Sequence, residues 1–172
     1  MYKYVILLLL VSTLDLYSSD VGFFKRVFGK LSWEQVCSEV KNPRNASLLV
    51  RRNVKYREDL DDIWETGKNT WERGFGDCED MAQSVLELCH TNNIKASIMI
   101  MVPDTGFEAH AIVIGTTESG HWYSSNGWYG ETKSIEEAVK EISKQIGWRR
   151  KTVNLISKSE FFYKSNLLLA KK

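Results

Sequence analysis

Prolines, cysteines and excess charge are all scarce in this sequence of 172 residues. With only two prolines and no low-complexity tract or internal repeat, nothing indicates a long linker between domains. The formal net charge of +1 provides no concentrated basic surface for nucleic acid, and the short basic run at 148–151 is too small to supply one. With 43% hydrophobic residues, the chain is long enough to bury the core of one domain. We therefore expect a single domain and no nucleic-acid partner.

The apolar stretch near the N-terminus is too short to span a membrane. A lysine precedes an apolar run over residues 4–14, and two serines follow at 18–19. This pattern is typical of a secretory signal and falls well short of the roughly 20 residues that cross a bilayer. We expect residues 1–19 to be a signal peptide and 20–172 to be one exported domain, periplasmic or secreted. Large residues at 16–17 leave an uncleaved signal anchor, which would be the one membrane contact, as an alternative. A buried N-terminal helix is the other alternative.

Three cysteines leave at least one thiol unpaired, even in an oxidising compartment. Cys37 and Cys89 are the conceivable disulfide pair, although two buried free thiols fit their apolar helical surroundings equally well. Cys78 has different neighbours. A lone cysteine is usually a small buried residue, but this one is flanked by polar and flexible residues: Gly76, Asp77, Glu79 and Asp80. Its surroundings favour a helix end at a cleft.

A helix is predicted directly behind Cys78. Asp77 is a good N-cap residue, and Asp80 three positions later approximates a capping box. Apolar residues then recur at helical spacing as far as about Asn92, namely Met81, Ala82, Val85, Leu86 and Leu88. The helix can bury this face while its N-terminus presents the thiol and favours the thiolate. The sequence therefore predicts Cys78 as a nucleophile.

Helices are predicted in the first half of the chain and strands mainly in the second. Ser32 opens a helix through a capping-box pattern, which Asn42 and Pro43 stop, and a second helix is expected over 57–65 with Gly67 at its end. Apolar runs bounded by turn residues predict strands at 94–102, 109–115, 121–126 and 152–156, with a capped helix opening at Ser134 before the last of them. This order predicts an α+β fold with an antiparallel sheet, not alternating βαβ units.

The expected hairpin brings two polar residues together. His110 opens the second predicted strand and Asn126 closes the third, so the two lie at the same end of neighbouring strands. His90 is excluded as the base because about twelve helical residues place it roughly 18 Å from Cys78. His121 lies at the opposite end of the hairpin. We therefore predict His110 as the general base and Asn126 as the residue that orients its ring.

These residues resemble a known family. Gly76-Asp77-Cys78-Glu79-Asp80 followed by Ala109-His110-Ala111 and a strand with a polar end is similar to the bacterial transglutaminase-like cysteine peptidases, within the papain-like transglutaminase-core superfamily. The stretch 71–75 also resembles what precedes their cysteine, and the likeness covers residues 56–129. It implies a cysteine-bearing helix on an antiparallel sheet and a Cys-His-Asp triad. This chain departs at the third member, where Asn126 replaces the aspartate.

The expected chemistry is hydrolysis of a peptide or isopeptide amide through a thioester on Cys78, with a protein or peptide as substrate and no cofactor. Acyl transfer to an amine is an alternative that the sequence does not separate from hydrolysis. A catalytically inactive, exported binding module of the same fold is another. A metal site from Cys78, Asp80 and His110 is disfavoured because no pair of cysteines or histidines has zinc-ligand spacing.

Overall fold

The computed structural model describes residues 30–58, 63–105, 108–149 and 151–169. The predicted signal peptide, residues 1–19, and part of the helix expected over 57–65 lie outside this range. Within the described ranges, no helix combines the length and apolar character that crossing a bilayer requires.

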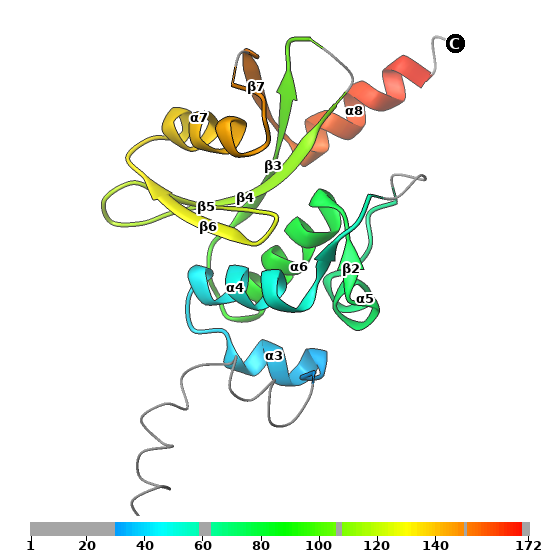
Figure 1. The fold of residues 1–172 in the computed structure, drawn as a ribbon, viewed down its shortest axis with the longest axis vertical. Coiled ribbons are helices and arrows are strands. Elements are labelled where there is room, and N and C mark those ends of the chain that lie inside the picture. The colour runs from blue at the N-terminus through cyan, green and yellow to red at the C-terminus, as the bar shows by residue number, and fades with distance from the viewer. Residues whose placement is uncertain (1–29, 59–62, 106–107, 150, 170–172) are drawn as a thin grey trace, which may run out of the picture.

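A five-stranded antiparallel sheet forms the centre of the fold, with strand order β6-β5-β4-β3-β7 (Figure 1). Its strands are β3 Ser97–Pro103, β4 His110–Thr116, β5 His121–Ser125, β6 Trp128–Thr132 and β7 Val153–Ser157. The predicted hairpin is confirmed, because Thr116 pairs with His121 and Val113 with Ser124. Strand β6 was not predicted.

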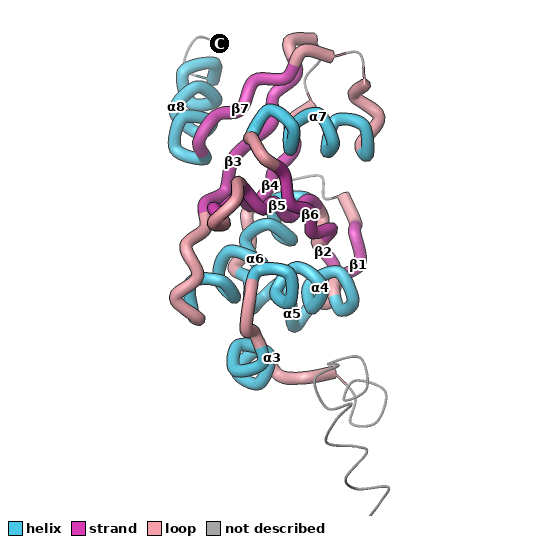
Figure 2. The backbone as a smooth tube through the Cα atoms, turned by 90° about the vertical axis from the view of Figure 1, so that its left-hand side faces the viewer, coloured by secondary structure: helices cyan, strands magenta, loops and turns pink. Residues whose placement is uncertain are grey.

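Helices cover both faces of this sheet, which confirms the α+β class. One face is covered by α4 Pro43–Asn53 and the long helix α6 Cys78–Thr91, and the other by α7 Ile135–Gln145 (Figures 1 and 2). The remaining elements are helices α3 Trp33–Glu39, α5 Gly67–Arg73 and α8 Lys158–Leu169, and a parallel strand pair, β1 Lys55–Tyr56 with β2 Phe75–Gly76.

The two faces of the sheet carry separate cores because strand side chains alternate in direction. On β4, Ala111 and Val113 pack with α4 and α6, whereas Ile112 packs beneath α7. The α6 core includes Leu49, Val50, Val85, Leu88, Ile100 and Trp122, and the α7 core includes Met101, Tyr123, Ala138, Ile142 and Trp148. Burial on both faces fixes β4, and therefore His110 at its start, relative to α6.

Two helix boundaries differ from the sequence prediction. Asn42 and Pro43 end the first helical stretch as expected, but they also begin α4: the Asn42 side chain accepts from the Asn45 N–H, and Pro43 occupies a first-turn position that needs no donor. Gly67 begins α5 behind the N-cap Thr66 and does not end a preceding helix. A Cβ at Gly67 would lie 2.9 Å from the Ser84 Cα, so close packing on α6 accounts for this glycine.

Helix α6 is joined to the preceding segment through Asp80, whose side chain is fully buried. Its Oδ1 accepts from the Glu65 N–H at 2.9 Å, and its Oδ2 accepts from the Arg73 guanidinium at the end of α5. A buried carboxylate is tolerated only when it is paired and hydrogen-bonded in this way. The tie therefore fixes the first turn of α6 against α5.

Replacing Asp80 by alanine should lower the free energy of unfolding by about 3 kcal/mol, because it leaves the Glu65 N–H without its acceptor and removes the buried carboxylate that pairs with Arg73. Urea unfolding measures the loss. Glu34→Ala removes an exposed ion pair with Lys68 and is the matched control, expected to stay close to the wild type. Equal urea midpoints for Asp80→Ala and Glu34→Ala would show that the hydrogen bonds of Asp80 do not stabilise the position of α6.

Candidate active site around Cys78

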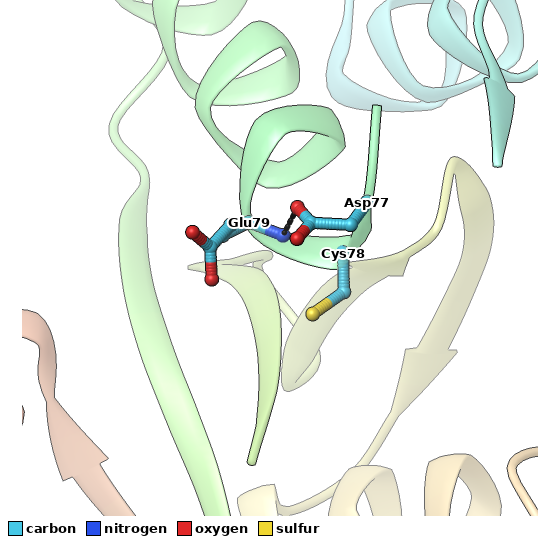
Figure 3. Close-up of side chains that lie close together, drawn as sticks. All are labelled: Asp77, Cys78 and Glu79. Atoms are coloured by element: carbon cyan, nitrogen blue, oxygen red, sulfur yellow. Dashed lines mark hydrogen bonds between the residues drawn. The ribbon is translucent and has the colours of Figure 1, made fainter. Parts of the chain in front are cut away.

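Cys78 is the first residue of α6, as the sequence predicted. The Asp77 carboxylate caps the helix by accepting from the backbone N–H groups of Glu79 and Asp80, at 3.1 and 3.2 Å. Figure 3 shows the Cys78 side chain directed away from the helix, with the Asp77 carboxylate bonded to the Glu79 backbone. The cap thus fixes the helix end from which the thiol projects.

Packing explains the Gly-Asp-Cys-Glu-Asp order. A Cβ on Gly76 would lie 2.6 Å from the Asp80 Cβ, so only glycine leaves room for the buried carboxylate. Gly74 provides the left-handed turn that ends α5, at φ 77°. Within seven residues, 74–80, the motif therefore provides a turn, a helix cap, the thiol and an anchoring carboxylate.

The thiol opens onto a cavity of about 390 Å³. Its walls include aromatic side chains from three separate segments, Tyr56, Trp64 and Phe161 of α8. Ala109 and Ala111, the two neighbours of His110 in sequence, also line the cavity, whereas His110 does not. The cavity therefore brings the end of α6 and the start of β4 to one place, which is where the sequence placed the site.

Burial raises the pKa of the Cys78 thiol to about 12. The carboxylates of Asp77 and Glu79 raise it further, while the Ala111 and Glu79 backbones act in the opposite direction. The prediction that the helix end favours thiolate is therefore wrong for the resting site. Desolvation outweighs a helix dipole that is worth about 0.3–1 kcal/mol.

His110 is the first residue of β4 and is 6% exposed. Its Nε2 lies 2.9 Å from the Ser125 Oγ, and its ring meets Trp148 edge-on at 6.5 Å. Burial lowers the pKa of His110 to about 4, so the imidazole is neutral at physiological pH. A neutral imidazole is the form that accepts a proton.

Asn126 follows β5 in a left-handed turn, at φ 48°, and the structure shows no hydrogen bond from it to His110. Its Oδ1 is buried without a partner in the part of the chain that is described. Ser125 can bond to His110 because side chains alternate along a strand. Ser125 lies on the same face of the sheet as Tyr123, and Tyr123 pairs with Ile114 of β4. Ile114 lies on the same face of β4 as His110. The alternation of side chains along β5 is therefore the sequence signal that points to Ser125.

The other expected site features can be placed as well. Within the described ranges, no hydrogen bond joins the Cys78 thiol to the His110 ring, although the thiol lies beside the Ala111 backbone. Cys37 and Cys89 are free thiols, not a disulfide.

The residues that could contact a metal ion differ from those weighed in the sequence. One ligand atom each of Asp77, Cys78 and Glu79 lies within 4.8 Å of the others. Asp80 is instead held by Arg73.

The sequence matches no known protein family and no curated protein. Among solved structures it is similar to LapG of Legionella pneumophila, with 16% identity, a TM-score of 0.51, and coverage of 91% of this chain and 93% of LapG. A structure of EGTA-treated LapG gives 18% identity and a TM-score of 0.49, covering 69% of this chain and 72% of that one. At these identities the likeness shows a shared fold.

The buried histidine predicts a pH-dependent stability. Because the unfolded chain binds a proton on His110 that the folded chain does not, stability is complete above about pH 6.5 and falls as the pH drops toward 4. By about pH 5 the loss should reach about 2 kcal/mol. Urea unfolding of wild type and His110→Gln at several pH values measures it, and the variant should lose most of the slope. If His110→Gln kept the same slope as the exposed-site control His90→Gln, His110 would not be the buried titrating group.

Proposed function

We propose that this chain is a transglutaminase-like cysteine peptidase that hydrolyses an amide bond in a peptide or isopeptide, with Cys78 as the nucleophile. The observation that carries the proposal is the position of Cys78: a capped helix end beside the start of the strand that carries His110, opening onto a cavity. The fold it shares with LapG, a transglutaminase-like cysteine peptidase, supports the same class.

The Cys78 thiol and the His110 imidazole are both neutral before the reaction. The neutral His110 ring can accept a proton, and because Ser125 Oγ bonds its Nε2, Nδ1 is the nitrogen that would take the proton of the Cys78 thiol in this proposal. The thiol attacks the substrate carbonyl as its proton passes to Nδ1, and a C–S bond forms. The tetrahedral intermediate then expels the amine, which takes that proton as the C–N bond breaks.

Water completes the reaction. His110 deprotonates a water molecule, which attacks the thioester carbonyl. The C–S bond then breaks, the acid is released, and His110 returns the proton to the Cys78 sulfur. The backbone N–H of Cys78 at the start of α6 is one donor to the oxyanion. Asn126 is the third residue of the triad in this proposal, and Ser125 is an additional positioning residue that the sequence did not reveal.

Export through residues 1–19 would place the substrate outside the cytoplasm, and an amine in place of water would turn hydrolysis into acyl transfer. A second candidate is a catalytically inactive binding module of the same fold. The raised pKa of Cys78 and the missing thiol–imidazole hydrogen bond favour it.

Activity should fall in steps across the site. Cys78→Ala and His110→Ala should abolish cleavage because these side chains exchange bonds and protons directly. Ser125→Ala should lose on the order of 10-fold to 100-fold, since the Ser125 hydroxyl orients the ring and a complete general base is worth about 10²–10⁴. Asn126→Ala should lose less than Ser125→Ala, because no hydrogen bond joins Asn126 to the His110 ring among the described residues. Digestion of a peptide library followed by mass spectrometry identifies a substrate, and kcat/KM on it ranks the variants.

If the chain is a catalytically inactive binding module, the wild type should show no cleavage that the Cys78→Ala substitution abolishes. His110→Ala with full activity would also exclude the proposed base. Thermal melts by circular dichroism serve as the folding control for all four variants.

A further inference from the structure

Residues of α7 and β7 line a groove. Figures 1 and 2 show α7 on the side of the sheet away from α6. The groove encloses a cavity of about 630 Å³. Val139 of α7, Leu155 of β7 and Trp148 provide apolar surface along it. The candidate chemistry at Cys78 does not use this groove.

The wall formed by β7 is the edge of the sheet. β7 comes last in the strand order and pairs only with β3, so its outer edge has no strand partner in the described part of the chain. An edge strand offers backbone N–H and C=O groups that an extended peptide can pair with, while its alternate side chains enter adjoining pockets. The groove thus has the form of a site for an added strand.

The rim of the groove is strongly basic. Lys140 and Lys144 of α7 and Arg149 all line it, and none of them forms an ion pair with a residue that the structure describes. Lys151 adds a fourth cation, and Glu136 is the one acidic residue of the lining. This surface favours a ligand that carries negative charge.

An ion pair connects the lining of the groove with the lining of the Cys78 cavity. Lys151 lines the groove and forms an ion pair with Glu108 at 2.7 Å, and Glu108 lines the Cys78 cavity. Trp148, also in the groove, meets the His110 ring at 6.5 Å. A chain bound along β7 would therefore lead toward the thiol.

We propose that the α7–β7 groove binds an extended, acidic segment of the protein substrate as an added strand on β7. Delivery of that segment to Cys78 rests on the proposed function, whereas the binding itself does not. Two other occupants fit the charge poorly. A second copy would bring the same basic rim against the first, and residues 1–29 carry three basic and two acidic side chains.

Binding is tested on full-length Cys78→Ala protein, which cannot cleave what it binds. Selection from a random-sequence peptide library should enrich acidic peptides, which are then labelled with fluorescein and titrated by anisotropy. The double variant Lys140→Glu with Lys144→Glu should weaken binding by about tenfold or more, because it reverses the rim charge. Lys41→Glu with Lys95→Glu makes the same change at exposed positions outside the groove and should leave affinity unchanged. N-methylation of alternate peptide amides should also weaken binding if the peptide pairs with β7.

Selection without acidic enrichment, or equal affinity for both double variants, would overturn the groove assignment. The groove assignment would also be overturned if the protein sedimented as a dimer and the double variant Lys140→Glu with Lys144→Glu sedimented as a monomer. The occupant of the groove would then be a second copy of the chain. The two proposals fail separately: binding without cleavage by the wild-type enzyme contradicts the proposed function alone, and cleavage unaffected by the groove variant contradicts the groove alone.

Discussion

The buried carboxylate of Asp80 is the contact on which the candidate site depends. It connects α6 to Arg73 at the end of α5 and to the backbone of Glu65, and it requires glycine at position 76. Asp77 then caps the same helix end. Because both carboxylates act within one helical turn, the direction of Cys78 is set by the helix anchor and does not depend on a flexible loop.

In the resting site, the Cys78 thiol and the His110 imidazole are both uncharged. A shift in the thiol pKa from 9.0 to about 12 corresponds to about 4 kcal/mol against the thiolate. The helix dipole offers about 1 kcal/mol at most in return. In the proposed reaction, activation comes from proton transfer to His110 during attack. Burial keeps the His110 imidazole neutral, the form that accepts a proton, but the lowered pKa of about 4 also makes it a weak base.

Local signals in the sequence predicted much of the architecture. The Asp77 cap, the apolar stripe of α6 and the hairpin between β4 and β5 each depend on residues close together in the chain, and all three are present. Helix α4 was missed because Pro43 was interpreted as a stop and not as a helix start. Gly67 was misassigned because its role comes from contact with Ser84, seventeen positions along the chain, which no local pattern shows.

The positions of the candidate residues were predictable from the sequence, although their catalytic roles remain a proposal. Cys78 lies at a helix end and His110 at a strand start, as predicted, but the hydrogen-bond partner of His110 depends on which side chains share a face of the sheet. Strand alternation gives Ser125, whereas Asn126 was predicted from its place at the strand end. The raised pKa of Cys78 was not predictable, because it depends on how deeply the tertiary structure buries the thiol.

The rate at which iodoacetamide alkylates Cys78 near neutral pH tests whether His110 activates this thiol. Mass spectrometry of the folded wild type and of His110→Ala follows Cys78 separately from Cys37 and Cys89. If His110 takes the thiol proton, Cys78 should be labelled about tenfold or more faster in the wild type than in His110→Ala, because the variant lacks the base. Equal Cys78 labelling rates in the two proteins would show that His110 does not activate the thiol.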